Sequence, residues 1–214
     1  MSFTIRATLP SDYRETEVVA REAFWNQHVP GCDEHYFLHI LRTSPAYLPD
    51  LDTMALLGSV IIGNVVYSNA VIKCDGGGEL QVLCLGLLAV LPQFQRKGAG
   101  RQLFEFTKLL ARHRGHHAVF LYGDPDYYSR LGFVPAEFFG VKTQDNMFAA
   151  ALQCYELREN ALTGIQGCFV EDKVFEIEEA AAREFDRSFP AKNMLAGTPS
   201  QARYLQVLEM RRKA

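Results

Sequence analysis

The chain has 214 residues, with 22 basic and 25 acidic side chains and a formal net charge of −3. Hydrophobic residues make up 48% and charged residues 22% of the chain. These values fit one compact globular domain, with or without a small extension, and exclude wholesale disorder. The slight acidic excess argues against a sequence-independent nucleic-acid binder, which carries a basic excess.

The first half of the chain predicts a strand, two helices and then three strands. A short β-prone segment is followed by an Asp12/Glu15 pair typical of a helix start. Beyond Ser44-Pro45 the pattern becomes β-rich, with interruptions at Gly58 and at Gly63-Asn64. The expected elements are a strand at 3–7, helices at 12–26 and 33–42, two antiparallel strands within 53–73, and a buried strand at 79–90.

The second half predicts a glycine-rich loop, an amphipathic helix and further strands. The loop spans 92–100, and the helix ends near 112–115. The remaining expected elements are strands at 118–122, 147–157 and 165–170, a short helix at 126–131, and helices at 178–187 and 200–210. This order predicts an α/β domain with a mixed sheet, in which 79–122 forms a right-handed parallel crossover.

Neither a membrane segment nor a cysteine framework is expected. No apolar run approaches the roughly 20 residues that span a bilayer, and the N-terminus lacks the pattern of a signal peptide. Five cysteines are scattered without a CxxC pair, which disfavours disulfides and zinc knuckles. The histidines at 113, 116 and 117 have no acidic or cysteine ligand at metal-binding spacing. We therefore expect a cytoplasmic protein without a metal, a membrane or a nucleic-acid partner.

The loop that opens the amphipathic helix has the chemistry of an anion-binding site. The backbone N–H groups at a helix N-terminus are unpaired, and the helix dipole favours negative charge there. Gly98 and Gly100 remove Cβ atoms where phosphate oxygens approach closely. Arg96, Lys97 and Arg101 add positive charge at the rim.

A second interpretation is that the two glycines only make a tight turn from strand to helix. The spacing matches neither of two common phosphate motifs. No Gly-Lys-Ser/Thr follows, and Leu103 stands where a dinucleotide fingerprint needs glycine. A nucleoside triphosphate or a dinucleotide is therefore disfavoured.

Two motifs resemble those of the GNAT superfamily of acyl-CoA N-acetyltransferases. The pattern Val90-x-Pro-x-x-Gln95-x-x-Gly98-x-Gly100 resembles the superfamily's motif A. Further on, Tyr128-x-x-x-Gly132-Phe133 resembles its Tyr-x-x-x-Gly-Phe element. The segments 42–49, 85–90 and 122–128 are similar to a YhbS-like bacterial subgroup, although Leu87 stands where that subgroup tends to have proline.

This resemblance implies a fold and a division of the chain. The implied fold is a mixed, mostly antiparallel sheet of six to seven strands with a parallel, splayed central pair, flanked by helices. Residues 1–173 would form the acetyltransferase domain. Residues 174–214 would form a C-terminal helical extension that packs on the core, adds to the acceptor pocket or mediates dimerisation.

The resemblance also implies residue roles. Acetyl-CoA would be the cosubstrate, with its pantetheine arm beside the strand around Leu88, Ala89 and Val90. The Leu88 N–H would polarise the thioester carbonyl, and Tyr128 would protonate the departing thiolate. Tyr127 is the rival for that role. The diphosphate would lie against the loop residues Gln95, Arg96, Lys97, Gly98, Ala99, Gly100 and Arg101.

The acceptor and the general base stay open. The implied reaction is direct attack of a primary amine on acetyl-CoA, with a small molecule as the first hypothesis for the acceptor. A protein N-terminus or lysine is the second hypothesis, and a non-catalytic acyl-CoA-binding module the third. The protein could be a monomer or a homodimer. Candidate bases are Glu79, Asp124, Glu34, Tyr67, His35 or a water chain, and the acceptor side would include Phe24, Trp25, His28, Tyr36 and Tyr47.

Overall fold

The computed structural model describes residues 3–214 and contains one nine-stranded sheet and one two-stranded sheet. The strands are β1 (Thr4–Ala7), β2 (Thr53–Leu57), β3 (Val60–Cys74), β4 (Glu79–Val90), β5 (Ala118–Tyr122), β6 (Val134–Pro135), β7 (Val141–Lys142), β8 (Met147–Ala149), β9 (Leu152–Glu156), β10 (Gly167–Val170) and β11 (Arg211–Lys213).

Six α-helices accompany these strands within the described part of the chain. They are α1 (Tyr13–Phe24), α2 (Glu34–Leu41), α3 (Ala99–His113), α4 (Pro125–Tyr128), α5 (Glu179–Asp186) and α6 (Pro199–Glu209). Short 3-10 turns lie at Pro10–Asp12, Pro49–Leu51, Pro92–Phe94, Ser129–Leu131, Ala136–Phe139 and Lys173–Phe175. None of the helices in residues 3–214 is long and apolar enough to span a membrane.

The main sheet confirms the predicted mixed α/β fold. Its order is β1-β2-β3-β4-β5-β9-β6, with β10 paired to β3 and β7 paired to β10. The pairs along the main path are antiparallel except β4–β5, which is parallel. The sheet has nine strands where six to seven were expected, because β6 and β7 have two residues each. Two residues are too few to show the alternation of apolar and polar side chains from which a strand is predicted.

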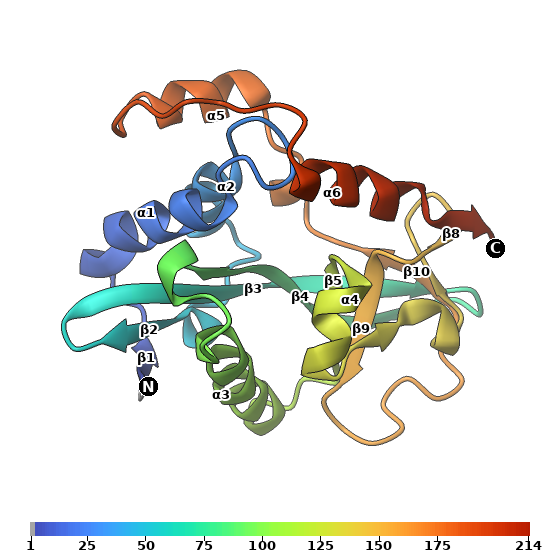
Figure 1. Cartoon of the computed structure of the whole chain (residues 1–214). Helices are drawn as coiled ribbons and strands as arrows, with labels where there is room; N and C mark the ends of the chain where they lie inside the picture. Colours follow the sequence, from blue (N-terminus) through green and yellow to red (C-terminus); the bar gives the residue numbers. More distant parts are fainter. Residues whose placement is uncertain (1–2) are drawn as a thin grey trace.

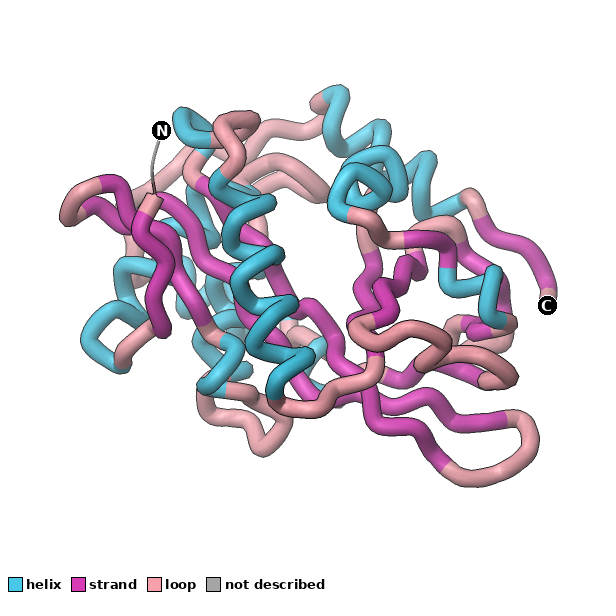
Figure 2. Tube along the Cα trace, turned by 90° about the horizontal axis from the view of Figure 1, so that it is seen from below, coloured by secondary structure: helices cyan, strands magenta, loops and turns pink. Residues whose placement is uncertain are grey.

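Helices cover both faces of the sheet. In Figure 1, α3 lies below the sheet, while α1, α2, α5 and α6 lie above it. Figure 2, seen from below, shows α3 running across the strands of the N-terminal half. Under α3 the core contains Leu83, Leu103 and Phe104, whereas Leu38, Val66 and Leu87 pack on the opposite face.

Three predicted features differ from the structure. Gly63-Asn64 does not interrupt β3: a Cβ on Gly63 would lie 2.9 Å from the Ala89 carbonyl oxygen, so glycine permits close strand packing there. The single strand expected at 147–157 is two strands, because β8 pairs with β11 whereas β9 pairs with β5 and β6 of the main sheet. The last helix is followed by β11, which pairs with β8.

The segment after β10 folds back onto the body of the chain. Phe185 of α5 lies 5.5 Å from the ring of Tyr36, and Arg21 bonds Asp186 at 2.6 Å. In Figure 1, α6 runs from the region of α2 toward β8. The extension therefore contacts α1 and α2 within the same chain.

Candidate functional site

The central strands separate before the part of β4 where the resemblance placed the thioester. β4 and β5 pair only at Leu83–Val119 and Cys84–Phe120, while β4 continues to Val90. Where β4 pairs with β3, a bulge leaves Gly86 without a partner, since Leu85 pairs with Tyr67 and Leu87 pairs with Val66. A Cβ on Gly86 would lie 2.9 Å from the Phe37 ring, so glycine lets α2 pack closely on β4 at this bulge. The upper half of β4 thus has one edge without a neighbouring strand.

That open edge offers two backbone donors. Hydrogen bonding alternates along an antiparallel strand, so every second residue of β4 directs its N–H toward β3. Leu91 donates to the Ile62 carbonyl at 2.9 Å, which puts Ala89 on the β3 side as well. The N–H groups of Leu88 and Val90 consequently point toward the gap left by β5. The Val90 carbonyl on this edge accepts a bond from Gln95 Nε2 at 3.0 Å.

The loop after β4 presents a run of unpaired backbone donors. Gly98 is the N-cap of α3 and has a φ of +92°, while Arg96 has a φ of +60°. Among residues 3–214, the six consecutive N–H groups from Arg96 to Arg101 have no backbone acceptor. The first paired amide is that of Gln102, which donates to the Gly98 carbonyl at 3.0 Å. Six free donors at the N-terminus of a long helix form a strong anion-binding arrangement.

The three basic side chains of this loop are held at its rim. Lys97 Nζ donates to the Gln93 carbonyl at 2.7 Å, and Arg101 donates to the Arg130 carbonyl. Arg96 is exposed. A carbonyl group has no net charge, so these bonds do not neutralise the positive charge of Lys97 and Arg101. The loop therefore keeps a positive electrostatic potential.

The two adjacent tyrosines of α4 occupy different parts of the site. Tyr128 is half-buried and packs on the core beneath α3, and a Cβ on Gly123 would lie 2.2 Å from its Cε2 atom. Tyr127 is 44% exposed, and its hydroxyl would lie 3.0 Å from a Cβ on Gly100. Tyr128 therefore lines the gap between β4 and β5, and Tyr127 lies at the loop.

Burial raises the pKa of both phenols. For Tyr128 the neighbouring Tyr127, Tyr67 and Cys84 add to the effect of burial, whereas Arg101 opposes it for Tyr127. A raised pKa keeps the hydroxyl protonated at neutral pH, as a proton donor requires.

Four of the five side chains considered as bases contact another polar side chain, and the fifth lies at the far end of β4. Glu79 is exposed at the start of β4, far along the strand from its open edge. Asp124 is bound by Arg203 at 2.8 Å, which lowers its pKa, and Glu34 bonds His28 at 2.9 Å. The two remaining groups, Tyr67 and His35, are fully buried, the first bonded to Thr107 and the second beside Asp186.

The aromatic residues expected on the acceptor side are mostly covered by the C-terminal extension. Trp25 Nε1 donates to the Asn193 carbonyl at 2.9 Å, and the His28 ring stacks on Tyr204 at 4.7 Å. Tyr47 instead donates to Asp52 at 2.8 Å in a buried network. The sequence could not show this covering, because it depends on contacts between segments more than 150 residues apart.

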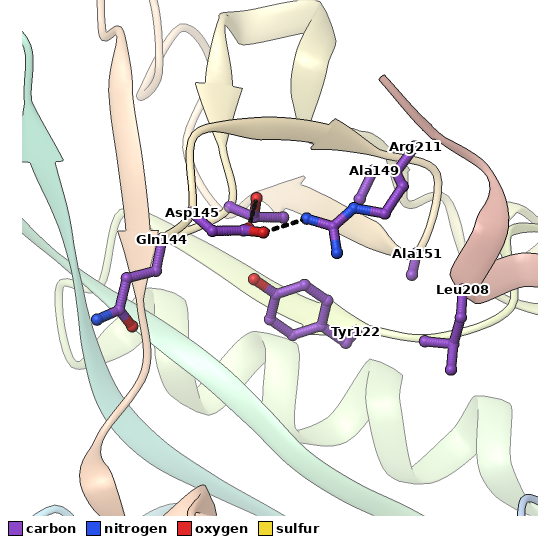
Figure 3. A pocket seen from close by; sticks show the side chains of 8 residues that line it. Tyr122, Gln144, Asp145, Ala149, Ala151, Leu208 and Arg211 are labelled. Carbon is purple, nitrogen blue, oxygen red and sulfur yellow. Dashed lines mark hydrogen bonds and ion pairs between the residues drawn. The ribbon is translucent and has the colours of Figure 1, made fainter. Parts of the chain in front are cut away.

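A cavity of about 590 Å³ opens on the sheet face opposite α3 (Figure 3). Its lining combines the end of β5, the loop before β8, the end of β8 with the turn into β9, and the C-terminal segment. The lining residues are Tyr122, Thr143, Gln144, Asp145, Ala149, Ala151, Leu208 and Arg211. No group of three or more metal-ligating side chains occurs in the part of the chain that the structure describes.

Known proteins are similar to this chain in sequence and in fold. A family model described as an acetyltransferase (GNAT) domain matches residues 56–135. The uncharacterized N-acetyltransferase YhbS of Escherichia coli K12 is 31% identical over 170 residues, covering 76% of this chain and 92% of the relative. The chain belongs to the GNAT acetyltransferases.

Solved GNAT structures agree with this assignment. The E. coli YhbS structure in complex with CoA has a TM-score of 0.72 and 26% identity, covering 82% of this chain and 92% of that one. A GNAT acetyltransferase from Brucella melitensis in complex with acetyl-CoA has a TM-score of 0.62 and 25% identity, covering 81% and 98%. The chain is thus a YhbS-like GNAT N-acetyltransferase, and the family and fold predicted from its two motifs are confirmed.

Proposed function

We propose that this GNAT N-acetyltransferase transfers the acetyl group of acetyl-CoA to the primary amine of a small molecule. The observation that carries the proposal is the run of six unpaired N–H groups from Arg96 to Arg101 beside the open edge of β4. A diphosphate fits this loop because its oxygens accept several bonds at once and its charge is favoured at the start of α3. The CoA and acetyl-CoA bound to the YhbS and Brucella proteins support the same cosubstrate here.

The edge of β4 would hold the pantetheine arm. The free N–H groups of Leu88 and Val90 bond its amide carbonyls as an added strand does. In this assignment the Leu88 N–H lies beside the thioester carbonyl and stabilises the oxyanion that forms during attack.

Tyr128 would supply the proton to the leaving thiolate. It lines the gap next to Leu121 and Cys84, and within residues 3–214 its hydroxyl has no hydrogen-bond partner, so the proton is free for transfer. Tyr127 is placed at the diphosphate loop, where its hydroxyl would bond the nucleotide end of the cosubstrate. Direct attack on a thioester needs no acyl-enzyme, so none of the five cysteines is required as a nucleophile.

The C-terminal extension favours a small acceptor over a protein surface. We assign residues 1–173 to the catalytic domain and 174–214 to this extension. From α6, Arg203 binds Asp124 at 2.8 Å and Tyr204 stacks on His28. The helix therefore joins the loop before α2 to the start of α4, and it obstructs the approach of a folded partner on this side of the sheet.

Calorimetry with acetyl-CoA and with S-acetylpantetheine tests this function. The second compound keeps the thioester but lacks the diphosphate and the nucleotide. We expect acetyl-CoA to bind at least about 100-fold more tightly, since two charge-assisted bonds contribute about 3 kcal/mol. Equal affinities, or no binding of acetyl-CoA at millimolar concentration, would overturn the proposal.

A further inference from the structure

The cavity on the face opposite α3 has the size and lining of a small-molecule site. Its volume of about 590 Å³ lies within the range of roughly 300–1,000 Å³ that such sites occupy. Apolar contact comes from Ala149, Ala151, Leu208 and the ring of Tyr122, as Figure 3 shows. An ion pair between Asp145 and Arg211 lies above that ring.

The C-terminal extension builds one wall of this cavity. Leu208 is on α6, and Arg211 begins β11. Arg211 is held in register with Ala149 by the β11–β8 ladder, and the Met210 carbonyl accepts from Ala150 at 2.8 Å. The cavity therefore exists only because the last residues of the chain return to the sheet.

Tyr122 connects this cavity to the gap between β4 and β5. It is the last residue of β5, immediately before Gly123, against which Tyr128 packs. Side chains alternate along a strand, and Leu121 packs beneath α3. Tyr122 thus faces the opposite side, so that the cavity and Tyr128 lie on the two faces of the same strand end.

Glu171 does not line the cavity itself, but it directly follows β10 in the same half of the sheet. It follows β10, whose Val170 pairs with Val71, and alternation directs it to the same face as Phe169. The Phe169 ring lies 5.0 Å from Phe120 and 6.0 Å from Tyr122. Glu171 is half-buried, and no ion pair or hydrogen bond to its carboxylate occurs within residues 3–214.

The titratable groups near Glu171 lie on β4 and β5. Burial raises the pKa of Glu171 to about 7. Burial also raises the pKa of Cys84 and of Tyr122, and the negative charge of Glu171 adds to both shifts. Cys84 on β4 and Tyr122 on β5 are therefore its titratable neighbours, while Asp145 of the loop before β8 and Arg211 of β11 also affect the pKa of Tyr122. Cys84 also adds to the raised pKa of Tyr128, so Glu171 and Tyr128 both lie near the residue at which the strands part.

We infer that this cavity is the acceptor site for a primary amine with a small apolar body, and that the Glu171 carboxylate accepts the proton of its ammonium group. The inference rests on the proposed acetyl transfer and assigns a function to two features that the cosubstrate site leaves unused. It gives the reaction a proton donor on the α3 side of the sheet and a proton acceptor on the side of Phe169.

The step balances with these two groups. Glu171 takes one proton from the ammonium, and the nitrogen lone pair then forms a C–N bond to the thioester carbon. The C–S bond breaks as Tyr128 gives its proton to the departing thiolate. The nitrogen loses its second proton to the phenolate of Tyr128, and Glu171 releases its proton to solvent, so that the products are an amide, a thiol and one proton.

Two matched pairs of variants test the inference. Glu171→Gln removes the base, and Glu159→Gln changes an exposed glutamate outside the cavity. Leu208→Arg puts a positive charge on the cavity wall, and Leu205→Arg does so at another exposed position of α6. Thiol release is followed with 2-phenylethylamine, tryptamine, spermidine and a lysine peptide as acceptors, and acetyl-CoA binding is measured by calorimetry.

We expect wild type to acetylate the arylalkylamines, with a bend in kcat/KM near pH 7. Glu171→Gln should lower the rate at neutral pH about 100-fold and remove the bend while binding acetyl-CoA normally. Leu208→Arg should raise the KM for the amine about tenfold through charge repulsion, and the two control variants should match wild type.

Several results would overturn the inference while leaving the proposed function intact. In each of them acetyl-CoA binds normally. The first is full activity of Glu171→Gln, the second is an equal effect of Leu208→Arg and Leu205→Arg on the KM for the amine, and the third is acetylation of the lysine peptide alone. The proposed function itself would be overturned by a different result, namely that the wild-type protein does not bind acetyl-CoA.

Discussion

The ring of Tyr128 lies directly against the α-carbon of Gly123, so that an added Cβ would come within 2.2 Å of its Cε2 atom. Gly123 is the first residue after β5, and its N–H donates to the Ala151 carbonyl at 2.9 Å. The end of the strand is thereby tied to β9 while leaving space for the ring. This contact fixes the phenol at the gap between the two parallel strands.

Gly123→Ala should displace Tyr128 and slow acetyl transfer. The added methyl group cannot fit without moving the ring, and small misplacements of a reacting group cost about 100-fold in rate. Steady-state kinetics of thiol release measures the effect. Gly76→Ala is the matched control, since nothing lies within 4 Å of a Cβ there. Wild-type turnover in Gly123→Ala would show that this contact does not position the proton donor.

Tyr128→Phe should lower kcat about 100-fold and leave the affinity for acetyl-CoA unchanged, because only proton donation to the thiolate is removed. Tyr127→Phe is the control on the adjacent residue. It should keep kcat and weaken cosubstrate binding slightly, since its hydroxyl lies at the loop near Gly100. The reverse pattern would transfer the acid role to Tyr127.

Gly100→Val should weaken acetyl-CoA binding at least tenfold. Its Cβ would lie 3.0 Å from the Tyr127 hydroxyl and 3.6 Å from Val90 Cγ2, so the side chain would fill the space above the free amides. Calorimetry measures the change. Gly98→Val should have an additional cost, because a β-branched residue at a φ of +92° is strained by about 1–2 kcal/mol. Wild-type affinity in both variants would place the diphosphate elsewhere.

Asp186→Ala should lower the free energy of unfolding by about 3 kcal/mol, because it leaves a buried cation without its partner. Arg21 is 3% exposed and bonds Asp186 at 2.6 Å, which joins α1 to α5 of the extension. Chemical denaturation followed by circular dichroism measures the loss. Glu179→Ala is the control, since that carboxylate is 83% exposed and a surface pair contributes under about 1 kcal/mol. Similar losses in both variants would mean that the buried pair does not hold the extension.

Glu171→Gln should stabilise the protein at alkaline but not at acidic pH. The pKa of Glu171 is about 7, above its usual value of 4.5, so the folded state holds this proton more tightly than the unfolded chain. Its contribution to stability is full below pH 4.5 and is lost as the pH rises through 7. Glutamine cannot ionise, so the variant should gain up to about 3 kcal/mol at pH 8 and little at pH 4.5. If the gain in the free energy of unfolding does not change with pH, burial does not disfavour the ionised form of Glu171.

The sequence predicted the elements that carry strong local patterns. β4 and β5 have the predicted bounds of 79–90 and 118–122, because buried strands form continuous apolar runs. The loop around Gly98 and Gly100 was predicted from helix-terminus chemistry. By contrast, β6, β7 and β11 depend on pairing with distant segments and show no periodicity. Glu171 was missed for a related reason: one glutamate after a short strand carries no motif, and only the fold brings it beside Cys84 and Tyr122.

The most direct measurement of the central claim is the ¹H–¹⁵N spectrum of the protein as acetyl-CoA is added. If the loop binds the diphosphate, the backbone amides from Arg96 to Arg101 should all shift strongly, and CoA without the acetyl group should move them in the same way. The account would be contradicted if acetyl-CoA bound and moved other signals while these six amides stayed in place.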